Sequence, residues 1–316
     1  MDLNRRKFIT TMAVAGAALP FTSNAAFRMQ DPHKVKFPFY FFTKALDMFE
    51  TDFMAETLAM VGGIDGLDVT VRPEGKVEPE RVEDDLPKVV EIGKKYGLET
   101  KMMVTSFTSP EDLYFKKVLK TASSLGINHY RLGYYTYDNS ADIWGFLHNL
   151  KKQFIDLVEM NKEYGIQAGY QNHAGGLKVG SPIWDLRELI HDLPVEYISS
   201  QFDIRHATVE GQSTWLLALR LLKDNIGSLA IKDFNWALKD GKSKSIGVPL
   251  GRGLIDFDAY FNTIKELKIE VPMTLHIEYS ILNDSEKDLT LLQKQKIIVG
   301  RLKTEVDFVQ SYLNKI

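Results

Sequence analysis

The stretch YISSQFDIRH, residues 197–206, decides the fold, because an apolar run ends there in two groups that can hold a metal ion or move a proton. Phe202 and Ile204 flank Asp203, and this alternation is the period of a β-strand whose two faces meet different surroundings. His206 follows at the end of the run. A carboxylate and an imidazole at the end of a buried strand indicate a site, since a buried charge without a partner is costly.

Eight segments of this kind recur at spacings of about 30 to 40 residues. Between them lie amphipathic stretches, such as residues 79–97 and 142–165, that have apolar residues at helical spacing and end in Gly. This pattern predicts an α/β protein with the (β/α)8 TIM barrel fold. The alternative is an open doubly wound sheet, but no GxGxxG follows the first strand to support it. The predicted strands are residues 35–43, 64–72, 98–107, 129–135, 166–173, 197–206, 227–234 and 271–279.

Alternate side chains of each predicted strand should face the barrel axis and the helical shell. The polar set assigned to the axis is Asp68, Thr70, Arg72, Arg131, Gln171, His173, Gln201, Asp203, Lys232, His276 and Glu278. The set assigned to the helices includes Leu67, Val69, Val71, Tyr130, Leu132, Tyr134, Leu275, Ile277 and Tyr279. So many charged groups around one axis predict a substrate site at the carboxyl ends of the strands. The alternative is a network of ion pairs that only closes the barrel mouth.

Composition limits the classes of function. The 316 residues are 44% hydrophobic and 26% charged, which is typical of a globular protein with one large domain or two smaller ones. A formal net charge of -3 predicts no nucleic-acid partner, because it gives no general attraction to a phosphate backbone. The chain has no cysteine, which excludes disulfides, thiolate metal ligands and a cysteine nucleophile.

The N-terminal residues have the pattern of a twin-arginine export signal. Arg5 and Arg6 precede a weakly apolar stretch that ends in small residues suited to a signal peptidase. The pattern predicts a signal peptide over residues 1–26, a mature domain over residues 27–316, and a periplasmic protein without a stable membrane anchor after cleavage. A retained membrane anchor is the alternative, although the apolar stretch is short for a span.

Five short motifs occur in a fixed order on the predicted strands. They are GYQNHAGG, FDIRHA, AIKDF, VPLGRGLIDF and LHIEY. Together they resemble the xylose isomerase-like TIM barrel family of sugar and sugar-phosphate isomerases and epimerases, over essentially the whole mature chain. The resemblance implies a divalent metal ion (manganese, magnesium or zinc) and a small-molecule carbohydrate as substrate.

The resemblance also implies a set of metal ligands, in which this chain departs from the family. Glu278 and Asp203 match two ligand positions, but Gln171 stands where the epimerases have Glu and Ala230 stands where they have His. Fewer anionic and imidazole ligands should weaken the binding of a divalent ion. His173 is included in the expected set, and either His206 or His276 could replace it as the compensating ligand. The expected metal ligands are Gln171, His173, Asp203 and Glu278.

The expected roles follow from the chemistry of isomerisation, which needs a base beside a carbonyl and an electrophile for the enediolate. Glu278 is the expected base, with Asp203 as a ligand or second acid-base group. Lys232 is the expected electrophile where the metal is weak or absent, and His206 completes the catalytic set. The expected substrate-binding residues are Arg72, Arg131, His173 and His276. The alternatives are that His206 caps a loop and that His276 is an interior histidine.

Three functions remain open at this point. The first is an isomerase or epimerase of an unphosphorylated sugar, because sugar phosphates are scarce outside the cytoplasm. The second is a lyase that eliminates the aglycone of a 3-keto-glycoside, which needs the same proton abstraction. The third is a sugar-binding barrel without catalysis. A homo-oligomer is compatible with all three.

Overall fold

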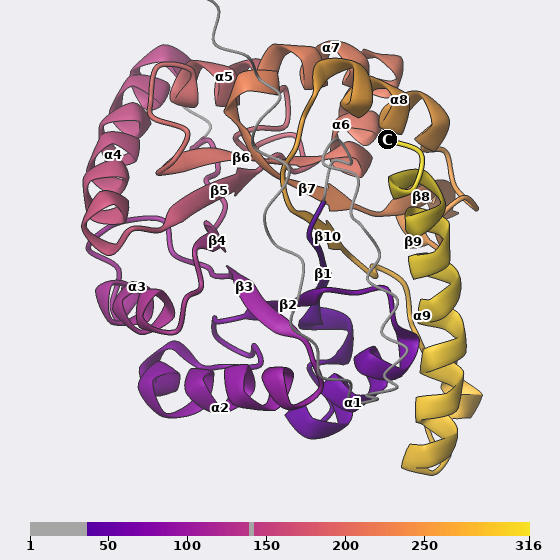
Figure 1. Ribbon diagram of the computed structural model, residues 1–316. Helices are drawn as coiled ribbons and strands as arrows, with labels where there is room; N and C mark the ends of the chain where they lie inside the picture. The colour runs from indigo at the N-terminus through magenta and orange to yellow at the C-terminus, as the bar shows by residue number, and fades with distance from the viewer. Residues whose placement is uncertain (1–36, 139–141) are drawn as a thin grey trace, which may run out of the picture. The chain divides into compact units, whose positions relative to one another are not determined.

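A computed structural model describes residues 37–138 and 142–316, so the predicted signal peptide lies outside the described residues. Eight parallel strands form a closed barrel in the order β1-β10-β7-β6-β5-β4-β3-β2 (Figure 1). This closure confirms the predicted (β/α)8 fold and overturns the alternative of an open sheet. The barrel strands are β1 (Phe39–Phe42), β2 (Gly66–Thr70), β3 (Glu99–Val104), β4 (His129–Arg131), β5 (Gln167–Gln171), β6 (Ile198–Asp203), β7 (Ile226–Ile231) and β10 (Met273–Leu275).

Helices surround the barrel, and the long last helix packs against the first (Figure 1). They are α1 (Thr51–Val61), α2 (Val82–Lys95), α3 (Phe115–Ser124), α4 (Ile143–Tyr164), α5 (Trp184–Ile190), α6 (Ile204–Gly211), α7 (Trp215–Leu222), α8 (Phe257–Leu267) and α9 (Leu291–Leu313). α4 begins where the Asp142 carboxylate accepts a hydrogen bond from the backbone N–H of Gly145, and it ends at Gly165 in the left-handed conformation. These caps explain why the sequence of residues 142–165 predicts a helix with these ends. Within the described residues, no helix has the length and apolar character needed to cross a membrane.

The alternation of side chains along the barrel strands follows the prediction where the strands are regular. Leu67 and Val69 are fully buried in the core between the barrel and the helices. Asp68, between them, points into the barrel and accepts a hydrogen bond of 2.9 Å from the Thr274 hydroxyl. The interior of the barrel is therefore polar near this level, and the apolar core is the layer outside it.

The junction after β6 is tighter than the sequence suggested, because the predicted strand over 197–206 ends early. β6 stops at Asp203, and α6 begins at the next residue. The Asp203 carboxylate caps this helix by accepting a hydrogen bond of 2.9 Å from the backbone N–H of His206. This cap fixes the direction in which α6 leaves the barrel, and it places the His206 side chain beside the carboxylate.

Tyr134 corrects the predicted facing of the fourth strand. Tyr130 and Leu132 are buried on the outer side as predicted, but the Tyr134 hydroxyl donates a hydrogen bond to Oε1 of Gln171, which was assigned to the axis. The reason is that β4 ends at Arg131, so the alternation of a strand no longer applies three residues later.

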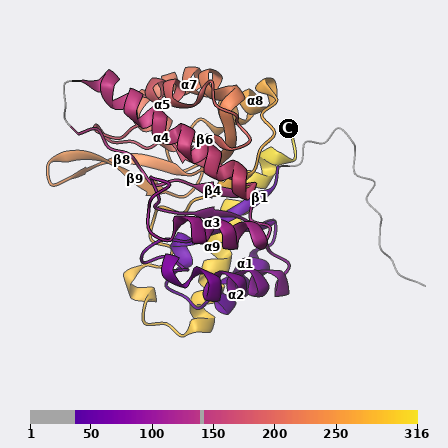
Figure 2. The ribbon, with the colours of Figure 1, turned by 90° about the vertical axis from the view of Figure 1, so that its left-hand side faces the viewer.

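A two-stranded hairpin, which the sequence reading missed, interrupts the chain between β7 and α8. β8 (Asp233–Lys239) and β9 (Lys242–Val248) pair in antiparallel fashion and are joined by Asp240 and Gly241, both with positive φ. Figure 2 shows the hairpin projecting from the barrel. Since it begins directly after β7, the hairpin belongs to the carboxyl end of the barrel, where the polar side chains gather.

Candidate active site

A small cavity of about 150 Å³ lies at the carboxyl ends of the strands. It is well below the roughly 300–1,000 Å³ of sites for drug-sized ligands, so it suits a small molecule. Its walls come from six barrel strands or the loops that follow them and from the start of α6. The lining residues are Phe42, Lys44, Arg72, Arg131, Tyr134, His173, Arg205, His206, Lys232 and Glu278.

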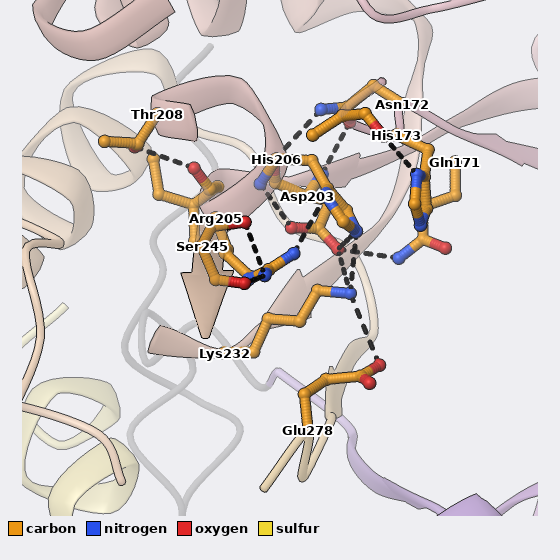
Figure 3. Close-up of polar contacts among 12 residues, drawn as sticks. Gln171, Asn172, His173, Asp203, Arg205, His206, Thr208, Lys232, Ser245 and Glu278 are labelled. Carbon is orange, nitrogen blue, oxygen red and sulfur yellow. Dashed lines mark hydrogen bonds and ion pairs between the residues drawn. The ribbon is translucent and has the colours of Figure 1, made fainter. Parts of the chain in front are cut away.

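Asp203 lies beneath this cavity and organises its floor (Figure 3). Its side chain is fully buried, and Oδ2 accepts a hydrogen bond from Gln171 Nε2 at 2.6 Å and forms an ion pair with Lys232 Nζ at 2.9 Å. The backbone of Asp203 is held by the Asn172 side chain, which donates to its carbonyl at 3.0 Å and accepts from its N–H at 2.7 Å. With Oδ1 used as the cap of α6, both oxygens of Asp203 are committed, so the residue acts as an anchor.

Lys232 connects this anchor to the opposite wall. The side chain is almost fully buried after β7, and Nζ lies 2.9 Å from Asp203 Oδ2 and 3.7 Å from Glu278 Oε1. Figure 3 shows the ammonium group between the two carboxylates. This position brings a localised positive charge to the cavity without exposing it to bulk water, where it would be screened.

His206 is held between two cations. Its Nε2 lies 3.0 Å from Lys232 Nζ, and its Nδ1 lies 3.2 Å from Arg205 Nη1. Burial and the neighbouring Lys232 charge lower the pKa of His206 well below its ordinary value. The imidazole is therefore neutral at physiological pH, and it suits the role of a hydrogen-bond acceptor for Lys232.

His173 lies against His206, with ring centroids 3.9 Å apart. Its Nδ1 faces the Ala174 carbonyl at 2.8 Å, so Nδ1 carries the hydrogen and Nε2 keeps a lone pair. Burial lowers the pKa of His173 as well. The residue lines the cavity, and its Nε2 can accept a proton or a hydroxyl hydrogen bond there.

Glu278 is the carboxylate in the cavity wall. One oxygen lies 3.7 Å from Lys232 Nζ, and the other accepts a hydrogen bond of 3.3 Å from Lys44 Nζ. Burial by itself would raise the pKa of Glu278, but the charges of Lys232 and Lys44 lower it below the ordinary value. Glu278 is therefore ionised at neutral pH and is able to accept a proton.

The cation side of the cavity is formed by Arg131, Arg72 and the ring of Phe42. Arg131 donates a hydrogen bond of 2.8 Å to Gln171 Oε1 and is only 6% exposed. The guanidinium carbons of Arg72 and Arg131 lie 5.9 and 5.8 Å from the Phe42 ring centroid. Both arginines line the cavity, as predicted from the alternation of their strands.

His276 is not part of the cavity lining. It is fully packed inside the barrel, where its ring lies 4.4 Å from that of Phe42, centroid to centroid. Burial and the Lys232 charge lower its pKa well below the ordinary value. This geometry corrects the expected role in substrate binding, because Phe42 stands at the cavity and His276 supports it from within.

A divalent metal ion does not fit this arrangement, although the resemblance implied one. Residues 37–138 and 142–316 contain no group of three or more His, Asp or Glu side chains that could hold it. The Lys232 ammonium already lies between Asp203 and Glu278. Gln171 offers only Oε1, which accepts from two donors. The expected ligand set of these two carboxylates with Gln171 and His173 therefore does not form a metal site, because a lysine supplies the positive charge instead.

Sequence reasoning missed Lys44, Tyr134, Arg205 and the hairpin as parts of the site. Arg205 Nη2 donates to the carbonyl and the hydroxyl of Ser245 in β9, at 3.3 and 3.1 Å, so the hairpin helps to hold this cation. The signal for the hairpin was present as Asp240-Gly241 between two runs of strand character, which is the strongest short-range hairpin pattern. Strand alternation does not assign Lys44 or Arg205 to the axis, because Lys44 follows β1 and Arg205 lies in the first turn of α6.

Gly247 in β9 is expected to be a sensitive position for catalysis. A Cβ added at this residue would lie 2.4 Å from the Glu278 carbonyl oxygen and 2.9 Å from the Glu278 Cβ. Gly247→Ala should therefore displace Glu278 and lower kcat by about tenfold to a hundredfold, because small misplacements of a reacting group are costly. Gly300→Ala in α9 is the matched control, since nothing lies within 4 Å of its added Cβ. Equal kcat values for the two variants would contradict the contact.

Comparisons with known proteins agree with the barrel fold. The family model described as Xylose isomerase-like TIM barrel matches residues 62–295. A xylose isomerase domain protein from Planctomyces limnophilus is similar at 17% identity, with 89% of this chain and 98% of that chain covered and a TM-score of 0.64. D-psicose 3-epimerase with D-tagatose from Clostridium cellulolyticum H10 is similar at 11% identity, with 87% and 99% covered and a TM-score of 0.62.

A third solved structure, the IOLI protein with a binding zinc atom, is similar at 17% identity, with 87% of this chain and 99% of that chain covered and a TM-score of 0.66. A search of curated proteins finds no match. These identities are low, so the structural likeness speaks for the fold alone. The family model, however, covers most of the chain, and its description agrees with the resemblance drawn from the five motifs. The chain belongs to the xylose isomerase-like TIM barrel family.

Proposed function

We propose that the protein abstracts a proton next to the carbonyl of a small unphosphorylated sugar, as an isomerase or epimerase. The observation that carries this proposal is the placement of the Lys232 ammonium between Asp203 and Glu278 at a small cavity. A fixed positive charge beside an ionised carboxylate is the pair that enolisation needs. The similarity to structures of sugar 3-epimerases supports the same substrate class.

The reaction assigns one role to each member of the pair. Glu278 takes the proton from the carbon next to the carbonyl, and the electrons of that C–H bond form the C=C bond of an enediolate. The carbonyl electrons move to oxygen, where the Lys232 ammonium donates a hydrogen bond to the developing charge. For an isomer, the proton returns to the former carbonyl carbon, while the hydroxyl proton of the first carbon passes to the enediolate oxygen and the first carbon becomes the new carbonyl. For an epimer, a proton is returned to the opposite face of the first carbon and the original carbonyl forms again.

His173 provides the second proton carrier that epimerisation needs. Glu278 follows β10 and His173 follows β5, and β7 and β6 separate these strands in the barrel order. The two groups therefore approach a bound sugar from different sides of the cavity. To reprotonate the face opposite Glu278, His173 must first take up a proton at Nε2, which it then donates to carbon. In the reverse direction the neutral Nε2 removes the proton and the protonated Glu278 returns one.

Elimination of the aglycone from a 3-keto-glycoside is the second candidate function, and an apolar groove beside the cavity favours it. The groove, about 660 Å³, is lined by Tyr137, Ile143, Trp144, Leu147, Leu177 and Trp184 among others. Trp144 and Trp184 are 73% and 68% exposed. Lys178 connects the two sites, because it lines the groove and its Nζ lies 5.4 Å from the ring centroid of Tyr134 in the cavity. An aromatic aglycone would fit such a surface.

The proposal is tested by hydrogen exchange in D2O. The mature protein is incubated with D-psicose, with D-tagatose and with a 4-nitrophenyl 3-keto-glucoside, and deuterium incorporation next to the carbonyl is followed by NMR. Exchange on a ketose would support the isomerase, and release of nitrophenol would support the lyase. A folded protein that exchanges none of them would contradict both and indicate a sugar-binding barrel.

Removal of divalent metal ions is expected to leave turnover unchanged within about twofold, because Lys232 supplies the positive charge that a metal would otherwise provide. The measurement is the exchange rate before and after dialysis against EDTA, with the metal content followed by elemental analysis. Loss of turnover that returns on adding manganese or zinc would overturn the assignment of Lys232 as the electrophile.

We also propose export through the twin-arginine route, because Arg5 and Arg6 precede an apolar stretch that ends in small residues.

A further inference from the structure

Three arginines line the cavity without an acidic partner. Lys44 and Lys232 form ion pairs with Glu278 or Asp203. By contrast, Arg72, Arg131 and Arg205 form no ion pair with any carboxylate in residues 37–138 and 142–316. An interior guanidinium without a counter-charge is costly, so these positions call for an explanation in ligand binding.

Arg72 and Arg131 keep hydrogen-bond donors that the protein itself does not use. Arg131 donates from Nη1 to Gln171, but its buried Nε has no acceptor among the described residues. The Arg72 side chain makes no hydrogen bond to any residue that the structure describes, and its guanidinium only approaches the Phe42 ring. Arg205 differs in part, because its Nη2 donates to the carbonyl and the hydroxyl of Ser245, although its Nε has no acceptor among the described residues.

The buried acid near these arginines does not neutralise them. Asp68 lies inside the barrel, where burial raises its pKa to about 7 against the hydrogen bond from Thr274 and the charges of Arg131 and Arg72. It therefore carries only part of a charge at neutral pH. The pKa of Arg72 is lowered by burial and by the repelling charge of Arg131, and the negative charges of Asp47 and Glu278 offset this only in part. A negative ligand between them would relieve this repulsion.

Attraction to the Phe42 ring does not account for the two arginines. Both guanidinium carbons lie just under 6 Å from the ring centroid, at the outer limit of a cation–π contact. The Arg131 guanidinium carbon lies closer, 4.9 Å, to the Tyr134 ring centroid. Contacts of this kind are weaker than charge-assisted hydrogen bonds, and they do not use the N–H groups in the plane of a guanidinium. The unused N–H groups therefore suit an acceptor with at least two oxygens and a negative charge.

We propose that the substrate carries an oxyanion, a carboxylate or a phosphate group, and that Arg72 and Arg131 bind it. This inference rests on the proposed function, which places the reacting carbonyl of the substrate beside Lys232 and Glu278. Arg72 follows β2 and Arg131 ends β4, whereas Lys232 follows β7 and Glu278 follows β10. The oxyanion and the carbonyl would thus occupy different sides of the cavity. Binding of the oxyanion would fix the position of the sugar relative to Lys232 and Glu278. Since the proposed sugar is unphosphorylated, the expected anion is the carboxylate of a sugar acid.

Equilibrium binding tests this inference without any turnover. Isothermal titration of the mature protein with D-glucose, D-glucuronate and D-glucose 6-phosphate, at one fixed low ionic strength, compares a neutral ligand with its two anionic forms. The expected result is a Kd at least about tenfold lower for an anion than for glucose, as charge-assisted hydrogen bonds imply. The better of the two anions identifies the group. Equal Kd values for all three ligands would overturn the inference.

Substitution of each arginine tests whether Arg72 and Arg131 cause the preference for an anionic ligand. Arg72→Gln and Arg131→Gln should each reduce the anion preference about tenfold while changing the Kd for glucose little. Arg72 is only half-buried, so its variant keeps the test valid if Arg131→Gln does not fold. Lys178→Gln is the matched control, because it removes one positive charge just outside the cavity. A preference that survives both arginine substitutions would refute the assignment.

The outcomes separate this inference from the proposed function. A protein that exchanges deuterium on neutral ketoses but shows no anion preference retains its function and loses the inference. A protein that prefers the anion, through Arg72 and Arg131, but catalyses no exchange on any sugar acid or ketose retains the inference as a binding property and loses the function.

Discussion

Replacing Lys232 by methionine is expected to lower kcat by about a hundredfold to a thousandfold, because the developing enediolate loses the buried ammonium that lies between Asp203 and Glu278. The same change should reduce the free energy of unfolding by about 3–5 kcal/mol, since it leaves the fully buried Asp203 carboxylate without its ammonium partner. Exchange kinetics in D2O and urea denaturation measure the two effects separately.

Two further variants keep these effects apart. Lys232→Met combined with Asp203→Asn removes both buried charges, so it should recover part of the stability while activity stays low. Asp233→Asn is the neighbouring control. Asp233 accepts hydrogen bonds from the backbone N–H groups of Phe234, Gly253 and Ile255 and holds the start of the hairpin. Asp233→Asn should therefore affect stability more than catalysis. A larger loss of kcat for Asp233→Asn than for Lys232→Met would show that the facing of this segment is wrong.

Glu278→Gln is expected to abolish turnover, with a fall in kcat of about a hundredfold to ten-thousandfold, because the amide cannot accept the proton that the carboxylate removes. The fold should survive, since Glu278 is half-buried and its partners Lys44 and Lys232 can turn to water or to Asp203. The circular dichroism spectrum and the midpoint of unfolding check the fold, and deuterium exchange checks the chemistry.

An exposed glutamate in α8 provides the control for this substitution. Glu266 pairs with Arg220 on the protein surface, and neither residue lines the cavity. Glu266→Gln should leave both kcat and the midpoint of unfolding unchanged. Unchanged turnover in Glu278→Gln would remove Glu278 from the mechanism and leave His173, with its open Nε2, as the base.

The barrel could be read from the sequence because its strands obey a strict rule. A strand between two different surroundings must alternate its side chains, so Leu67 and Val69 faced the helices and Asp68 the interior as predicted. The same rule predicted that Arg72, Arg131, Asp203 and Lys232 face the barrel axis. It failed at Tyr134, because the rule holds only while the backbone remains extended, and β4 ends at Arg131.

The contacts within the site could not be read from strand periodicity. Alternation predicts that Lys232 faces the axis, but the 3.7 Å between its Nζ and Glu278 depends on how far β7 and β10 are shifted against each other. The metal expectation came from a resemblance, and the side chains of the described site do not fit it, because a resemblance transfers positions without transferring charge. Asp203 and Glu278 still stand at two positions of metal ligands, but the Lys232 ammonium lies between them, so they do not form a metal site.

The hairpin after β7 has a consequence for how this protein could diversify. Its two strands pair only with each other, and it meets the site through Ser245 and Gly247 near its base, while the turn at Asp240 and Gly241 is exposed. Insertions at that turn would therefore leave the hydrogen bonds of the barrel untouched. Evolution, or a designer, could alter the rim of the cavity by lengthening the hairpin, while the barrel tolerates the change at little thermodynamic cost.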